Sequence, residues 1–161
     1  MNRKAVVLAI ALLGLGSFVL TGQQPATSTV FTAAQADAGR TAFENSCGQC
    51  HTYSVRGRKG EEGELPPLAS LPAPYQKFIG PRGRVPALMG AAFVQKYGQK
   101  KVTEMFTLFR GAADTTPVAE LHMSDDTLVN ITAYILQKNG AKPGNQPLEK
   151  TTGDLFGSVV E

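Results

Sequence analysis

The amino-acid sequence predicts an all-α protein with about four to five helices joined by long loops. Two segments have apolar residues at helical spacing together with capping residues at their starts, one near residue 33 and one near residue 125. Between them lies a segment rich in proline and glycine, and no segment alternates apolar and polar residues as a half-buried strand does. The 161 residues suit one domain once a targeting segment is set aside.

The first predicted helix covers residues 33–45. Thr32 followed by Gln35 has the capping-box form, in which each side chain bonds the other residue's backbone N–H. Gly39 lies inside this helix at a cost of about 1 kcal/mol relative to alanine. Together with Phe43, it lies on the apolar stripe, so we expect another backbone to approach closely here.

The last predicted helix begins after Ser124, whose side chain can cap it. Asp125 and Asp126 stand in the first turn, where negative charge complements the helix dipole. An apolar stripe follows, and the pair Asn139-Gly140 is a typical helix end. The stripe consists of Leu128, Ile131, Tyr134 and Ile135.

The middle of the chain has weaker signals. Apolar residues between 92 and 109 predict one or two amphipathic helices, and residues 111–121, which contain Pro117, are expected to form a loop. Residues 52–84 mix charge blocks with prolines and are predicted to be a surface loop with a short helical turn at 75–79.

Both ends of the chain differ from the rest. Residues 1–31 are predicted to be an export signal or membrane anchor followed by a tether, because Arg3 and Lys4 precede an uncharged run over residues 5–20. Residues 145–161 are expected to be a polar tail. Without Arg3 and Lys4 the formal charge falls from +3 to +1, which argues against nucleic-acid binding.

The motif Cys47-Gly48-Gln49-Cys50-His51 predicts covalent attachment of a haem. Two cysteines three positions apart on a helical turn present both sulfurs to the same porphyrin edge, where each can form a thioether with a vinyl group. The histidine that follows can bind the iron.

Other uses of this motif have less support. A thioredoxin-like pair needs a βαβ neighbourhood, which the sequence does not indicate. A structural zinc site needs four ligands, and the chain has no other cysteine and only one other histidine, His122. A disulfide between Cys47 and Cys50 would close a tight loop.

The ordered motifs resemble those of the class I bacterial cytochromes c. A helix, the attachment motif, a long loop, the sequence Pro86-Ala87-Leu88-Met89-Gly90, middle helices and a last helix containing Ala133-Tyr134-Ile135 follow one another over residues 32–144. The last helix is similar to that of cytochrome subunits associated with quinoprotein dehydrogenases. The resemblance implies a cytochrome c-like bundle around one covalent haem c.

The resemblance also implies roles for particular residues. Cys47 and Cys50 would bond the haem vinyls, and His51 would be the proximal iron ligand. Pro86 would accept a hydrogen bond from His51, with Pro67 as a rival, and such a bond strengthens the imidazole as a ligand. Gly39 and Phe43 would cross the last helix near Tyr134.

The distal ligand departs from the family pattern. The family usually places Met-Pro before the last helix, and the corresponding dipeptide here is Thr116-Pro117. Met123 is the predicted distal ligand, and His122 is the second choice. The remaining alternatives are Met105 and an open sixth position, whereas Met89 is expected to be structural.

These inferences predict an exported, periplasmic electron carrier that is not itself an enzyme. Its partners would be a periplasmic dehydrogenase on one side and a terminal oxidase or another cytochrome on the other. The alternative is a five-coordinate haem protein that binds a small gas or reacts with peroxide, for which His122 would be the only acid–base histidine. A haem-free dithiol protein is a third interpretation.

Overall fold

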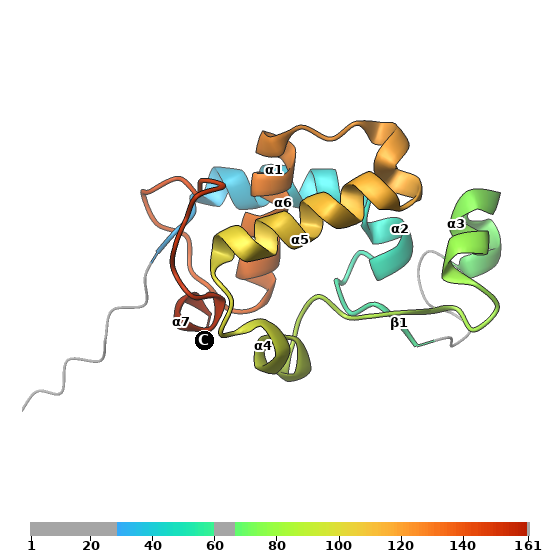
Figure 1. Ribbon diagram of the computed structural model, residues 1–161, viewed down its shortest axis with the longest axis horizontal. Helices are drawn as coiled ribbons and strands as arrows, with labels where there is room; N and C mark the ends of the chain where they lie inside the picture. Colours follow the sequence, from blue (N-terminus) through green and yellow to red (C-terminus); the bar gives the residue numbers. More distant parts are fainter. Residues whose placement is uncertain (1–28, 60–66, 161) are drawn as a thin grey trace, which may run out of the picture.

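The computed structural model describes residues 29–59 and 67–160 and confirms the predicted all-α, cytochrome c-like fold (Figure 1). The α-helices are α1 (Ala33–Glu44), α2 (Gly48–His51), α3 (Ala73–Ile79), α4 (Ala91–Tyr97), α5 (Val102–Thr115), α6 (Asp125–Lys138) and α7 (Phe156–Val159). Two 3-10 turns, η1 (Leu68–Ser70) and η2 (Pro117–Leu121), and two strands, β1 (Arg58–Lys59) and β2 (Arg84–Val85), complete the described elements.

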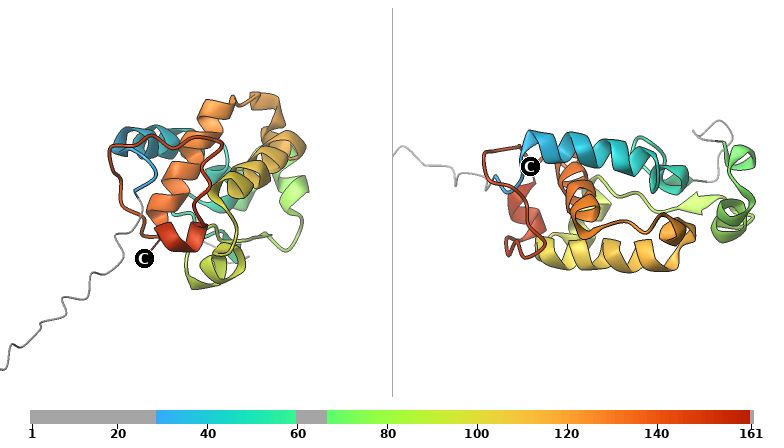
Figure 2. Two further views of the ribbon diagram at one scale, coloured as in Figure 1. Left: turned by 60° about the vertical axis from the view of Figure 1, so that its left-hand side comes forward. Right: turned by 90° about the horizontal axis from the view of Figure 1, so that it is seen from above.

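The helices are arranged around α6. Seen from above, α1 and α2 run along one side of the molecule, α5 runs along the opposite side, and α3 lies at one end (Figure 2). Most residues of α6 are buried, including Leu128, Ile131 and Leu136, so this helix forms the centre of the core.

The predicted capping boundaries of α1 and α6 are confirmed. The hydroxyl of Thr32 accepts a hydrogen bond from the Gln35 N–H at 3.2 Å, and Gln35 Oε1 accepts one from the Thr32 N–H at 3.2 Å. The hydroxyl of Ser124 accepts the Thr127 N–H at 3.1 Å. These bonds satisfy N–H groups that have no partner inside the helix, and they fix where each helix begins.

The predicted crossing of α1 and α6 is also confirmed. A side chain at Gly39 would collide with the backbone carbonyl of Asn130, so the two helix backbones touch there. One turn further, the rings of Phe43 and Tyr134 pack with their centroids 5.5 Å apart. The close approach explains a glycine that is otherwise unfavourable inside a helix.

The prediction of a loop over residues 111–121 was wrong for residues 111–115, which are helical. Helix α5 continues to Thr115 and ends just before Pro117, whose ring disfavours helical geometry in the preceding residue. Gly111 lies inside α5 with open space around it, so it weakens the helix without ending it. Residues 117–121 then form η2.

The two strands were missed by the sequence analysis. Arg58 pairs with Val85 and Lys59 with Arg84 in an antiparallel ladder. Strands of two residues are too short to show an alternating pattern, and the pairing joins residues separated by a long loop.

The segment expected to be a polar tail packs on the domain. Phe156 is 1% exposed and makes an edge-to-face contact with Phe93, with the ring centroids 5.6 Å apart. Backbone bonds run from the Val102 N–H to the Asp154 carbonyl and from the Phe156 N–H to the Lys100 carbonyl. The apolar residues of this segment are too widely spaced to give a helical signal in the sequence.

The C-terminal segment also bonds the first turn of α1. The side-chain amide of Gln35 pairs with the backbone of Leu148: it accepts the Leu148 N–H at 2.7 Å and donates to the Leu148 carbonyl at 2.9 Å. Residues 148–160 therefore tie α1 to α4 and α5.

Within the described residues, no helix is both long and apolar enough to cross a membrane. The predicted export signal or anchor falls mainly on residues 1–28, which lie outside the described part of the chain.

We expect Gly39→Ala to destabilise the protein, because the added methyl group must push α1 away from α6. Overpacking of this kind costs about 1–3 kcal/mol, more than alanine gains in helix propensity. Thermal unfolding followed by circular dichroism measures the change. Gly111→Ala is the matched control, since its site in α5 is open, and it should stabilise the protein by about 0.5–1 kcal/mol. Equal stabilisation by both substitutions would contradict the close crossing.

A second prediction concerns the C-terminal segment. Phe156→Ala should lower the unfolding free energy by about 3–5 kcal/mol, because it leaves a cavity against Phe93. Leu155→Ala, at a neighbouring side chain that is 39% exposed, should change the unfolding free energy by about 0.5 kcal/mol or less. Denaturant unfolding of both variants makes the comparison, and similar small effects would show that this segment does not contribute to the core.

Candidate cofactor site

The attachment motif forms a single helical turn directly after α1. The carbonyl of Cys47 accepts hydrogen bonds from the Cys50 N–H at 3.0 Å and from the His51 N–H at 2.8 Å. This turn places both thiols and the imidazole in the wall of one cavity. The predicted grouping of Cys47, Cys50 and His51 is therefore present.

The cavity has a volume of about 360 Å³ and is lined mainly by apolar side chains. Residues of α2 and β2 form one part of its wall, and residues 108–118 of α5 and η2 form another. In the view from above, α2 and α5 lie on opposite sides of the molecule (Figure 2). Leu128, Ile131 and Ile135 of α6 close the inner end.

The imidazole of His51 is oriented by one backbone group. Its Nδ1 lies 2.8 Å from the carbonyl oxygen of Pro86. A carbonyl oxygen can only accept, so Nδ1 carries the hydrogen, and Nε2 of the neutral ring keeps its lone pair. Burial lowers the pKa of His51, and the bond to Pro86 offsets part of that change. The neutral form is the one that binds metals.

A strained turn brings Pro86 to this position. Thr52 and Val55 both have positive φ angles, of 60° and 65°, which are unusual for β-branched residues. The Val55 carbonyl accepts the Leu88 N–H at 2.9 Å, and this bond fixes the segment that follows Pro86. Gly57 has a φ of 72° and touches the backbone of Val85 and Pro86, so a side chain there would force the segments apart. Strain of this kind is typical of functional sites.

Asn139 holds the same segment from α6, a role that the sequence analysis missed. Its side-chain amide donates to the Leu88 carbonyl at 3.0 Å and to the Ile135 carbonyl at 2.8 Å, and its Oδ1 accepts the Gly90 N–H at 3.1 Å. The sequence shows Asn139 only as a helix-ending residue. Its buried position, 7% exposed, is what reveals the second role.

Of the two predicted partners for His51, the structure selects Pro86. Pro67 begins η1 as its cap, and its carbonyl bonds the Ser70 N–H and hydroxyl instead.

Both cysteines are free thiols in the structure. Burial raises the pKa of Cys47 and of Cys50, and the nearby Arg58 guanidinium lowers that of Cys50 in part. Raised thiol pKa values make the pair poorly suited to thiolate redox chemistry, which needs a lowered pKa. The described residues contain no group of three or more His, Cys, Asp or Glu side chains that could hold a metal ion by themselves.

The predicted distal ligands do not line the cavity. Met123 is partly buried against the core, and its carbonyl accepts the Arg110 Nη1 hydrogen bond at 2.8 Å. His122 is exposed and ends η2 in the left-handed conformation. Met105 is fully buried in the core, and Met89 packs against it, as expected for structural residues. Met123 as the distal ligand stays a prediction.

These observations fit a covalently held haem. An apolar cavity suits the porphyrin plate, the two thiols stand at its wall one helical turn apart, and the imidazole of His51 offers an unprotonated Nε2. The donor set, one imidazole and two thiols beside apolar side chains, is that of a haem attachment site rather than of a structural zinc site.

Comparison with known proteins agrees with the site. The sequence model of the family described as Cytochrome c matches residues 36–139, which include the attachment motif, the cavity and all of α6. Comparisons with curated proteins and with solved structures gave no significant match. The match covers more than half of the 161 residues, and the chain therefore belongs to the cytochrome c family, whose members hold covalent haem c and transfer electrons.

Proposed function

We propose that this protein is an exported, single-haem electron carrier of the class I bacterial type. The observation that carries the proposal is the joint position of Cys47, Cys50 and the neutral imidazole of His51 in one apolar cavity. When bound, the haem supplies an iron that changes between the ferrous and ferric states. No catalytic residue is proposed.

The chain's own residues attach and orient the cofactor. Cys47 and Cys50 would each hold the haem through a thioether to one of its vinyl groups; addition of S–H across the vinyl π bond forms one C–S and one C–H bond and would consume no oxidant. His51 would bind the iron through Nε2, while the carbonyl of Pro86 holds the ring and would increase its basicity. The apolar wall would keep water away from the haem. This exclusion of water, together with burial of the haem, would tune its reduction potential.

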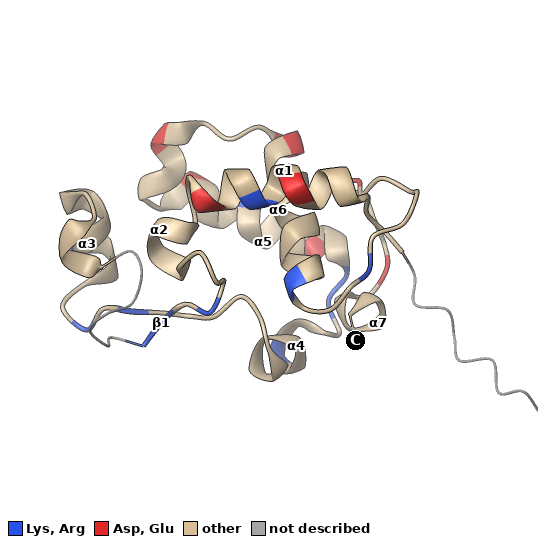
Figure 3. Cartoon of the chain, turned by 180° about the vertical axis from the view of Figure 1, so that it is seen from behind, with Lys and Arg blue, Asp and Glu red and all other residues tan. Residues whose placement is uncertain are grey.

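The proposed partners are redox proteins. A periplasmic dehydrogenase, of the quinoprotein class by resemblance, would donate electrons, and a terminal oxidase or another cytochrome would accept them. β1 and the chain beside it carry Lys and Arg (Figure 3), and Arg84 of β2 lies in the cavity wall. Basic groups beside the cofactor favour encounter with an acidic partner surface, an effect that salt weakens.

Residues 1–31 are proposed to direct export and to tether the domain of residues 32–144. Residues 148–160 pack on that domain, and we count them as part of its structure. Export places the thiols in the periplasm, where we expect haem attachment to occur.

Haem attachment is tested with protein matured in a bacterial periplasm. We expect the haem to remain bound to the wild type after acid–acetone extraction and to be lost from a Cys47→Ala/Cys50→Ala variant. Gln49→Ala, between the two cysteines, is the matched control and should keep its haem. Extraction of haem from the wild type would overturn the proposal.

The mass of the intact mature protein tests the haem number and the N-terminus together. We expect the mass of one haem added to a chain that either begins within residues 21–28 or retains the full sequence. Fractionation should place the protein in the periplasm or on the inner membrane. A mass without haem in a soluble cytoplasmic fraction would contradict both export and attachment.

A further inference from the structure

The cavity wall that faces α2 has an unusual composition for a site with an iron ligand. Its described residues between 112 and 118 are Ala112, Ala113, Thr116, Pro117 and Val118. None of these has a thioether or an imidazole, and His51 is the only histidine or methionine among all the cavity-lining residues that the structure describes. Thr116 supplies the only side-chain hydroxyl on this part of the wall.

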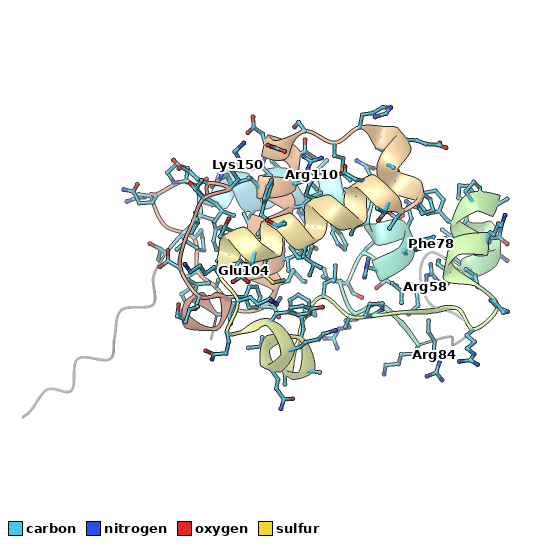
Figure 4. All side chains as sticks on the ribbon, viewed as in Figure 1. Arg58, Phe78, Arg84, Glu104, Arg110 and Lys150 are labelled. Carbon is cyan, nitrogen blue, oxygen red and sulfur yellow. The ribbon has the colours of Figure 1, made fainter. Side chains whose placement is uncertain are left out.

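The backbone of the neighbouring candidates, Met123 and His122, is held by specific contacts outside the cavity-lining segments. Arg110, labelled on α5 in Figure 4, donates from Nη1 to the Met123 carbonyl at 2.8 Å and from Nη2 to Asp125 Oδ1 at 2.6 Å. Ser124 caps α6 immediately after Met123. The loop is therefore fixed on both sides of Met123.

His122 is held in the same way from the other end of the loop. Its N–H donates to the Ala119 carbonyl at 3.1 Å, and its side chain is exposed. The backbone on both sides of the two candidates is therefore held, and neither His122 nor Met123 lines the cavity.

We propose that the sixth coordination position of the iron is open to a small neutral diatomic ligand, which binds against residues 112–118 with the Thr116 hydroxyl as its hydrogen-bond donor. The inference rests on the proposed haem site at His51 and adds a ligand-binding site to the electron carrier.

The cavity favours a neutral ligand over an anion. Burying a charge among apolar side chains is costly without a partner. The only charged side chain in the described wall is Arg84, which is exposed and lies two residues before Pro86, the residue bonded to His51.

Peroxide chemistry has less support from the same wall. Cleavage of peroxide needs a positioned acid–base group, and the described lining contains no carboxylate and no second histidine. A ligand can enter at the rim, where Phe78 and Leu108 line the cavity and are 59% and 43% exposed.

Carbon monoxide is the probe for this site, added to chemically reduced, haem-loaded protein and followed by absorption. We expect the wild type and Met123→Ala to bind carbon monoxide with equal affinity. Thr116→Met places a thioether on the wall, where it can compete with carbon monoxide for the iron. If the methionine occupies the iron for about nine-tenths of the time, the affinity for carbon monoxide falls about tenfold. The same variant should gain the weak long-wavelength ferric band of an iron–methionine bond and a higher reduction potential.

Thr116→Val tests the hydroxyl without changing the size of the side chain. A hydrogen bond to the bound ligand lowers the carbon–oxygen stretching frequency, so the valine variant should show a higher frequency than the wild type. This measurement also locates the ligand if Thr116→Met fails to fold, which haem content and circular dichroism would reveal.

Three results would overturn the inference. The first is a wild type inert to carbon monoxide with a long-wavelength band that Met123→Ala loses, which assigns Met123 as the ligand. The second is unchanged binding in Thr116→Met, and the third is an unchanged stretching frequency in Thr116→Val. Failure of the proposed function is distinct, because the haem itself would then be extracted by acid–acetone.

Discussion

The contact between Gly39 and the backbone of Asn130 determines how the rest of the molecule is placed. Because α1 touches α6 there, the turn that follows α1 starts at a fixed distance from the core, and Cys47 begins that turn. Phe43 and Tyr134 reinforce the contact one turn later. The position of both thiols thus depends on a glycine that takes no part in the chemistry.

The second half of the site is assembled from distant segments. The strained turn after His51, the bond from Leu88 to Val55 and the side chain of Asn139 converge on the segment that contains Pro86. Their joint effect is chemical: one carbonyl fixes the hydrogen on Nδ1 of His51 and so leaves Nε2 as the metal-binding atom. Burial acts in the same direction, since it favours the neutral ring.

Charged side chains at the surface join α5, the start of α6 and the C-terminal segment. Arg110 joins α5 to the loop before α6, and Lys150 adds a second cation at Asp125, with Nζ 3.0 Å from Oδ2. Hydrogen bonds from Lys150 and Arg110 lower the pKa of the Asp125 carboxyl. Through Lys150, the C-terminal segment supports the start of α6 and the loop before it. Thr116, which lines the cavity, lies just before η2 on the other side of that loop.

The sequence by itself determined the two capped helices, α1 and α6, and one half of the site. Capping at Thr32 and Ser124 and the attachment motif are local patterns, and each depends on residues only a few positions apart. Local periodicity also predicted α4 and α5, although the end of α5 was placed too early.

Only the tertiary structure decided the contacts between distant residues. It selected Pro86 over Pro67, gave Asn139 a buried role, folded residues 148–160 onto the core and left Met123 outside the cavity wall. Each of these outcomes depends on which surfaces are buried together when the chain closes on itself. Helical spacing carries no information about such long-range packing, because it reports only which face of a segment is apolar.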